Sequence, residues 1–197
     1  MFNRRLLFNG VGGNTPPTTL EFDIDKSGGS SLSGATITIS YNGETVTKTS
    51  DNKGLAVFYE VPTNTDIPYT VTAFGYADYT GSVNIAPGDY GWVNVEMVQP
   101  VLTIIVKDKE TGAGIANAQV YLRDGNHQML MQLGITDSSG SLALSGLTLE
   151  PGEYYFDASA MGYEAMLVGY PYTVVDSSPI VGTITLEITK GFVLPGT

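Results

Sequence analysis

The sequence has no cysteine and only one histidine among its 197 residues. Without thiols, the fold depends on no disulfide and no thiolate metal site can form. The single histidine, His127, lies beside an expected turn at Asp124-Gly125, and we interpret it as a solvated loop residue. The chain has no second histidine that could belong to a catalytic triad at another place or complete a histidine-based metal site. Ser-His-Asp and Cys-His catalysis therefore have no support. We expect a protein that is not an enzyme and that holds no metal and no cofactor.

Long apolar runs are also missing. No stretch approaches the roughly 18 apolar residues that span a bilayer. A secretory signal needs an apolar core of about 7–15 residues, whereas the N-terminal segment has only the run Leu6 to Phe8 after its arginines. We therefore expect no membrane as a partner, and the start of the sequence is a poor match to a secretory signal.

Basic residues are scarce. The chain has 9 Lys and Arg against 20 Asp and Glu, which gives a formal net charge of −11. An acidic body repels phosphate backbones, so no nucleic acid is expected as a partner. The exception is the N-terminal segment, because residues 1–20 contain Arg4 and Arg5 and no acid. A short basic arm on an acidic body indicates an anchor that docks elsewhere.

This arm, residues 1–18, also has an apolar tip. Glycines and prolines between residues 10 and 17 forbid a regular element before the first strand. We predict that the tip docks on another subunit, because this hinge decouples it from the body; packing against its own body is the alternative. The residues expected to make the contact are Phe2, Arg4, Arg5, Leu6, Leu7 and Phe8.

What the sequence does contain is an internal repeat. Residues 19–98 and 101–190 follow one pattern, with recurring positions 82 to 91 residues apart. Each copy has the size of an immunoglobulin-like sandwich and can bury its own core. We expect two domains, residues 19–98 and 99–190, and a tail at 191–197 that is either a last edge strand or a docking peptide.

Each copy has the pattern of β-structure. Leu20 to Asp25 alternates apolar and polar residues, which is the period of a half-buried strand. Asn42-Gly43 is the strongest short hairpin signal and suits a type I′ turn. No segment keeps a helical apolar period over three turns, and Gln99-Pro100 marks the junction of the copies. The expected fold class is all-β, with two tandem immunoglobulin-like β-sandwiches and an extended N-terminal arm.

Three kinds of recurring position carry a family resemblance: a small residue that opens a strand, a loop glycine, and a Gly-Tyr pair. They are Ala35 and Ala118, Gly54 and Gly140, and Gly75-Tyr76 and Gly162-Tyr163. The pattern resembles the carboxypeptidase regulatory-like domains, relatives of the transthyretin-like and Cna-B-type sandwiches. The resemblance covers nearly the whole chain past residue 18. It implies the fold but no function, because such domains are appendages of peptidases, transporters, adhesins and virion proteins.

The arm carries a second resemblance. Arg4 to Phe8, a Gly-rich stretch and then immunoglobulin-like modules look like structural proteins of tailed phages that infect gut Bacteroides and their relatives. In that group such modules decorate heads or build fibres and collars.

Two acidic patterns are better explained by structure than by chemistry. Asp23 to Gly28 looks like the opening of an EF-hand loop, but the twelfth position is Gly34, where that motif needs a bidentate glutamate. We interpret the run as a strand that continues into a turn. Glu96 and Glu187 occupy matching places in two different domains, so a glycosidase pair cannot form and we expect both to face outward. An irregular calcium site stays open at Asp51, Asp108 or Asp137.

The Cna-B-type resemblance also implies a possible Lys–Asn isopeptide bond assisted by a buried acid. The candidates are Lys26 with Asn94 in the first copy, where the acid position is Thr72. In the second copy they are Lys107 and the acid Asp157, but the final strand contains no Asn. Neither copy holds a complete set, so no such bond is expected.

Tyrosine and tryptophan side chains that reach the surface can stack on sugar rings or anchor a protein interface. We expect half of them to serve core or hairpin packing, and we favour a protein contact for the others. The candidates are Tyr76, Tyr79, Tyr90 and Trp92 in the first copy and Tyr170 and Tyr172 in the second.

These observations predict a non-enzymatic structural protein of a virion. It would be a capsid decoration or auxiliary protein, or a collar or fibre-attachment protein, assembled in the host cytoplasm. Its arm would tether it to other virion subunits, either capsid or collar and tail proteins. The alternative is an adhesin or glycan-binding module at the bacterial cell surface, whose ligand is a host-surface glycan or protein.

Overall fold

The computed structural model describes residues 18–166 and 168–191, which form β-strands joined by turns and loops. The predicted fold class, all-β with tandem immunoglobulin-like sandwiches, is confirmed. No helix in this part of the chain is long and apolar enough to cross a membrane. The arm up to residue 17 lies outside the described residues.

The chain divides into two compact units. The first comprises the chain up to Val71 together with Tyr79–Glu96, and the second comprises Thr72–Asp78 and the chain from Met97 onward. The domain boundaries 19–98 and 99–190 stay predictions from the sequence.

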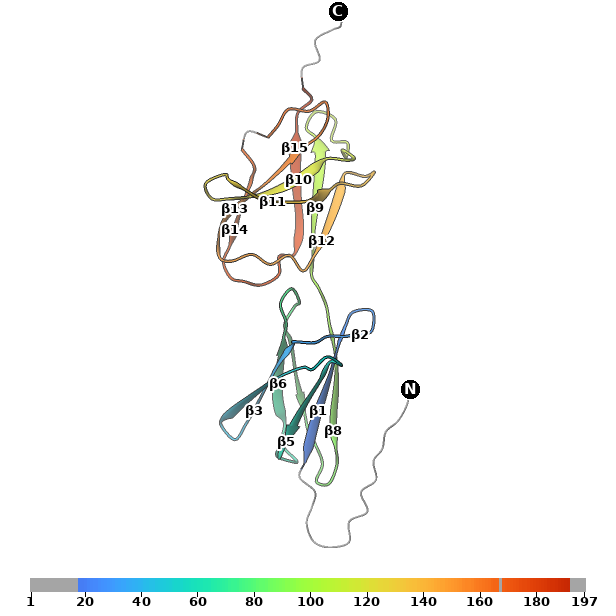
Figure 1. Ribbon diagram of the computed structural model, residues 1–197, viewed down its shortest axis with the longest axis vertical. Coiled ribbons are helices and arrows are strands. Elements are labelled where there is room, and N and C mark those ends of the chain that lie inside the picture. Colours follow the sequence, from blue (N-terminus) through green and yellow to red (C-terminus); the bar gives the residue numbers. More distant parts are fainter. Residues whose placement is uncertain (1–17, 167, 192–197) are drawn as a thin grey trace, which may run out of the picture. The chain divides into compact units, whose positions relative to one another are not determined.

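The first unit has two sheets. In one sheet, β1 pairs with β2, β5 and β8, and Figure 1 shows β1 between β5 and β8. The other sheet has the order β4-β3-β6-β7. The strands are β1 (Thr19–Lys26), β2 (Ser30–Ser31), β3 (Thr36–Tyr41), β4 (Glu44–Thr49), β5 (Leu55–Tyr59), β6 (Ile67–Thr72), β7 (Tyr79–Val83) and β8 (Gly91–Met97).

The second unit repeats this topology. Its sheets have the orders β12-β9-β15 and β11-β10-β13-β14, so β9 takes the central place that β1 has in the first unit. The strand β15 runs parallel to β9, and β12 is antiparallel to it. The strands are β9 (Val101–Asp108), β10 (Gln119–Asp124), β11 (Met129–Ile135), β12 (Ser141–Ser145), β13 (Gly152–Ser159), β14 (Tyr170–Val174) and β15 (Gly182–Ile188).

Strict alternation along the central strands builds both cores. In β1, Leu20, Phe22 and Ile24 are fully buried, because successive side chains of a strand point to opposite faces. The ring of Phe22 packs edge-on against Phe58, with 5.7 Å between the ring centroids. In β9 the fully or almost fully buried apolar residues are Leu102, Ile104 and Val106.

A buried hydroxyl joins two sheet-to-sheet crossings in the second unit. Thr136 follows β11 and precedes β12, which belong to different sheets. Its Oγ1 donates to the carbonyl oxygen of Ile115 at 2.7 Å and accepts from the N–H of Ala118 at 2.9 Å. Ile115 and Ala118 lie on the other crossing, from β9 to β10. One side chain therefore holds two crossings together.

Ser50 has the same role in the first unit. It lies between β4 and β5, donates to the carbonyl of Leu32 at 2.7 Å and accepts from the N–H of Ala35 at 3.0 Å. Both hydroxyls are buried, where an unpaired backbone group would be costly. The strand-opening alanines of the repeat are thus the residues whose N–H groups these hydroxyls bind.

The residue after each hydroxyl is an aspartate that shapes the loop. Asp51 Oδ1 accepts from the N–H groups of Lys53 and Leu55 at 2.8 and 2.9 Å. Gly54 has φ +79°, and a Cβ there would overlap the carbonyl oxygen of Ile24. The loop glycine therefore lies in a tight turn that a larger residue could not form. The second unit builds the same loop. Asp137 Oδ1 accepts from the N–H groups of Ser139 and Ser141, and a Cβ at Gly140 would overlap the carbonyl oxygen of Val106.

The two hairpin signals have different outcomes. Asn42 and Gly43 have φ values of 50° and 79°, so the predicted type I′ turn is confirmed. At the second signal the turn is longer, because Asp124 Oδ1 binds the N–H groups of Asn126 and Gln128. The left-handed residue there is His127, with φ 61°.

The two acidic patterns have the structures predicted for them. The strand β1 continues through Lys26, with Ile24 buried between Asp23 and Asp25, so the EF-hand-like run is a strand. Glu96 and Glu187 are exposed at alternate positions of β8 and β15 and face outward.

We expect Thr136→Val to lower the free energy of unfolding by about 1–3 kcal/mol, because it keeps the side-chain volume and leaves two buried backbone groups without this partner. Differential scanning calorimetry measures the effect. Thr185→Val, at an exposed position of β15, is the matched control and should stay within about 0.5 kcal/mol of the wild type. Equal effects of the two substitutions would contradict the role of the hydroxyl.

Candidate functional site

The outer face of the first unit carries a row of acids. Glu21, Asp23 and Asp25 alternate along β1 with the buried core residues, so their side chains lie on the side of the sheet away from the core. The pKa of Asp23 is raised, first by its partial burial and then by the charges of Asp25 and Glu21. The row is therefore a crowded line of like charges that a neighbouring cation would relieve.

Aromatic side chains flank one end of this row. Tyr59 lies opposite Thr19 in the β1–β5 register and is 63% exposed. Trp92, at the start of β8, is 60% exposed, and Tyr90 just before it is 57% exposed. The hydroxyl of Tyr90 donates to the carboxylate of Glu21. We call Glu21, Asp23, Asp25, Tyr59, Tyr90 and Trp92 the acidic–aromatic face.

Electrostatics hold parts of this face in place. Burial and the hydrogen bond to the Glu21 carboxylate raise the pKa of Tyr90, so its hydroxyl stays protonated and continues to donate. Lys48 Nζ lies 5.3 Å from the ring centroid of Tyr59, within the range of a cation–π contact. The Tyr90 hydroxyl is therefore fixed by Glu21, Lys48 lies over the ring of Tyr59, and Trp92 remains 60% exposed.

The second unit shows that the fold does not require these residues. Its equivalent of Thr19↔Tyr59 is the pair Val101↔Ser145, because the two units share register. By the same register, β9 has Thr103, Ile105 and Lys107 where β1 has the three acids, and the repeat aligns Thr183 with Trp92. One fold thus displays acids and aromatics in one copy and mainly neutral residues in the other. This difference makes the acidic–aromatic face the candidate functional site.

Of the predicted aromatics, two lie on this face. The others are placed differently: Tyr79 stacks on Tyr69 with 6.3 Å between centroids, and Tyr172 packs edge-on against Phe156 of the second core. Tyr170 is exposed and Tyr76 is half-buried. A binding role for each of them stays a prediction.

The sequence reasoning missed four members of the face, which are Glu21, Asp23, Asp25 and Tyr59. A signal existed, because an acid at every second position of a strand places all of them on one side. The predicted contact residues of the arm lie outside the described residues, as does the tail from residue 192.

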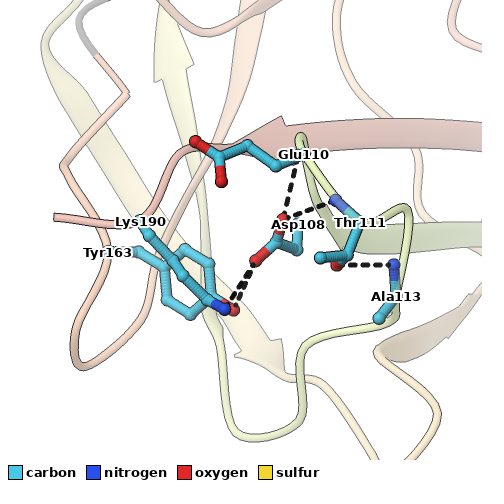
Figure 2. Close-up of polar contacts among 6 residues, drawn as sticks. All are labelled: Asp108, Glu110, Thr111, Ala113, Tyr163 and Lys190. Atoms are coloured by element: carbon cyan, nitrogen blue, oxygen red, sulfur yellow. Dashed lines mark hydrogen bonds and ion pairs between the residues drawn. The ribbon is translucent and has the colours of Figure 1, made fainter.

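A second polar cluster lies in the second unit, at the end of β9 (Figure 2). Asp108 is almost fully buried, and its Oδ1 accepts from the N–H groups of Glu110 and Thr111, each at 2.9 Å. Its Oδ2 accepts from the Tyr163 hydroxyl at 3.1 Å and lies 3.7 Å from Lys190 Nζ. One carboxylate therefore ties the loop after β9 to the Gly-Tyr loop and to Lys190, two residues after the last strand.

These bonds hold the Asp108 carboxylate ionised. The bond from the Thr111 N–H is the largest cause, the Glu110 N–H and the Tyr163 hydroxyl add to it, and burial opposes it; the pKa of Asp108 falls to about 2. A carboxylate with such a pKa and with its oxygens engaged by the protein is unsuited to proton transfer near neutral pH. The cluster is a structural tie rather than a catalytic or metal site.

The other candidate chemistry is also accounted for. Arg123 forms an ion pair with the buried Asp157, on the face of β13 opposite Phe156. Lys26 and Asn94, the isopeptide candidates of the first unit, are both exposed. Within residues 18–166 and 168–191, no group of three or more His, Asp or Glu side chains could hold a metal ion.

Comparisons with known proteins found similarity only among solved structures. No protein-family model matches the sequence, and no curated protein matches it. The chain is similar to the Bacillus anthracis TIE protein, at 18% identity and a TM-score of 0.40, over 89% of this chain and 34% of that one. It is similar to the shaft pilin SpaA from Lactobacillus rhamnosus GG, at 14% identity and a TM-score of 0.43, over 91% and 100%. The third is the minor pilin GBS52 of Streptococcus agalactiae, at 14% identity and a TM-score of 0.38, over 90% and 99%.

The chain thus spans about a third of the length of the TIE protein. At these identities and TM-scores the neighbours say nothing about the function of this chain.

We expect Asp108→Asn to reduce stability in a pH-dependent way. The folded pKa lies below the unfolded value of about 3.9, so the ionised carboxylate stabilises the fold above that pH, and this contribution disappears as the pH falls toward about 2. Urea denaturation between about pH 6 and pH 2.5 should show the wild type and the variant converging at the acid end. Asp89→Asn, at an exposed position in the first unit, is the control. A gap that stays constant with pH would contradict this assignment.

Proposed function

We propose that the protein is a non-enzymatic structural module of a surface assembly and that it binds a protein partner through the acidic–aromatic face of its first unit. The observation that carries the proposal is the divergence of the two units. Three acids and the aromatics Tyr59 and Trp92 occupy positions where the second unit has Thr103, Ile105, Lys107, Ser145 and Thr183. Exposed aromatics at positions that the fold leaves free are better explained by a partner than by stability.

The chemistry of the face favours a protein partner with both positive and apolar groups. Arginine side chains can form bidentate pairs with carboxylates such as Asp23 and Asp25 and can also stack on aromatic rings. Tryptophan and tyrosine are enriched at the centres of protein interfaces. Trp92 and Tyr59 present such rings at one end of the acidic row. A basic and apolar peptide or loop fits this combination.

The described residues support a structural role over a catalytic one. The most strongly perturbed acid, Asp108, is bound by Glu110, Thr111 and Tyr163, and the acid Asp157 is paired with Arg123. Neither carboxylate is bound to a nucleophile–base pair of the kind that a catalytic site needs.

A glycan-binding module is the second candidate, and Trp92 is the observation that favours it. Trp92 is exposed and lies two residues after Tyr90, whose hydroxyl binds the Glu21 carboxylate. A flat aromatic ring with a carboxylate nearby would suit a sugar ring and its hydroxyl groups. This candidate corresponds to an adhesin at the bacterial cell surface. The structural module can belong either to the cell surface or to a virion, and the arm is the part of the sequence that favours the virion.

We expect the double variant Tyr59→Ala, Trp92→Ala to lose incorporation into the native assembly by about tenfold or more, because removal of central interface aromatics typically costs 2 kcal/mol or more each. Tagged protein is quantified in purified virions and in isolated cell-surface fractions of the source organism. Ser145→Ala with Thr183→Ala, the equivalent positions in the second unit, is the matched control. Normal incorporation of the double variant, or absence of the wild type from both preparations, would contradict the proposal.

Glycan binding is tested separately. If the second candidate is correct, the wild type binds defined oligosaccharides on an array in a saturable way, and Trp92→Ala weakens this by about 1 kcal/mol or more, the scale of an aromatic contact. Thr183→Ala should bind as the wild type does. The structural-module proposal expects no saturable binding to any sugar on the array.

A further inference from the structure

We infer that the acidic–aromatic face of one copy receives the N-terminal arm, residues 2–8, of a second copy, so that copies join head to tail. The inference rests on the proposed function and names the partner of its site. The face belongs to the described residues, whereas the arm is known from its sequence alone.

Charge complementarity is the first argument. The chain as a whole carries −11, yet residues 1–20 contain Arg4 and Arg5 and no acid. The row of Glu21, Asp23 and Asp25 is where the first unit concentrates negative charge along one strand. Like charges crowd this row, and the pKa of Asp23 is raised as a result of burial and of its two neighbours. A pair of arginines is the group that such a row binds most favourably.

Apolar matching is the second argument. Beside its arginines, the arm has Phe2, Leu6, Leu7 and Phe8. The acidic row is flanked on β5 by the half-buried Leu55 and Val57 and the exposed Tyr59, and on β8 by Trp92. A segment that carried only charge would leave these rings in water. A segment that carries both arginine and large apolar residues covers the acids and the rings together.

The place where the arm joins the chain favours a second copy over its own face. The arm enters β1 directly, because Pro16 and Pro17 lie just before Thr18 and β1 begins at Thr19. A proline restricts the residue before it to extended backbone, so the sequence disfavours an immediate reversal at the Pro-Pro pair. We therefore take a second copy as the occupant of the face, and a wild type that stays monomeric is the outcome expected if the arm binds its own face instead.

The geometry of the contact follows from its two different surfaces. Arm and face are distinct, so each copy offers one of each and the contact is heterologous. Heterologous contacts produce rings when the rotation closes and open chains when it does not. A surface assembly can grow in this way from a single kind of subunit, without a disulfide, since the chain has no cysteine.

The experiment uses the full chain and two charge-reversed variants in sedimentation-velocity ultracentrifugation. One variant carries Arg4→Glu and Arg5→Glu in the arm, and the other carries Glu21→Lys, Asp23→Lys and Asp25→Lys on the face. The wild type should associate with rising concentration, and each variant alone should associate about tenfold or more weakly, since several ion pairs become repulsive. A one-to-one mixture of the two variants should recover association, because each arm then meets a face of opposite charge.

Two controls keep the result interpretable. Thr103→Lys changes the position in β9 that corresponds to Glu21 and should leave association unchanged. The milder face variant Glu21→Gln, Asp23→Asn, Asp25→Asn removes the negative charge without reversing it, and this variant should also weaken association. Raising the salt from about 0.05 M to about 0.5 M should weaken the association of the wild type. Circular dichroism checks that every variant is folded.

Two results would overturn the inference. One is a wild type that stays monomeric at every concentration; the other is a mixture of the reversed variants that fails to recover association while both are folded. In either case, the double variant Tyr59→Ala, Trp92→Ala can still abolish incorporation into the native assembly. The proposed function then stands, and the face binds a different protein. If the wild type associates head to tail but is absent from virions and cell surfaces, the assembly role fails and the contact stands.

Discussion

Each unit of this protein depends on one buried hydroxyl. In each unit, two loops carry the chain from one sheet to the other, and the hydroxyl of Ser50 or Thr136 lies on one of them. This hydroxyl donates to a carbonyl and accepts from an N–H of the other loop, so it joins the two. The aspartate that follows, Asp51 or Asp137, fixes the next loop through backbone bonds to its carboxylate. Once the crossings are joined, the alternation of the central strands decides which side chains enter the core. The outer face is then free to vary.

Much of this architecture is predictable from the sequence, for physical reasons. The alternation in Leu20 to Asp25 can serve only a strand with one buried side, and Asn42-Gly43 permits the positive φ values of a tight hairpin. The loop at Asp124 is longer than expected because the aspartate side chain caps two N–H groups, which moves the left-handed residue to His127. Side-chain caps of this kind compete with two-residue turns, and the sequence pattern is the same for both.

The candidate site is harder to predict than the fold. Trp92 and Tyr90 stand out in the sequence by type alone, whereas Glu21, Asp23 and Asp25 resemble ordinary solvated strand residues. Their meaning depends on register, which places Tyr59 opposite Thr19 and shows what the second unit has at the same positions. The tie at Asp108 was equally hidden, since Tyr163 lies 55 residues away in sequence and only folding brings its hydroxyl to the carboxylate.

The two units use their acids in opposite ways, and this contrast follows from where each acid lies on its strand. Asp108 occupies a core-facing position of β9, where burying an unpaired charge would be costly. Hydrogen bonds from Glu110, Thr111 and Tyr163 offset this cost and hold the carboxylate ionised. The corresponding position of β1 in the register is Lys26, which is exposed and needs no such support. The acids of β1 instead occupy the outward positions, where Tyr90 engages one of them and solvent screens the others. The charge of Asp108 is therefore bound by groups of its own unit, whereas the charges of Asp23 and Asp25 remain available to bind another molecule.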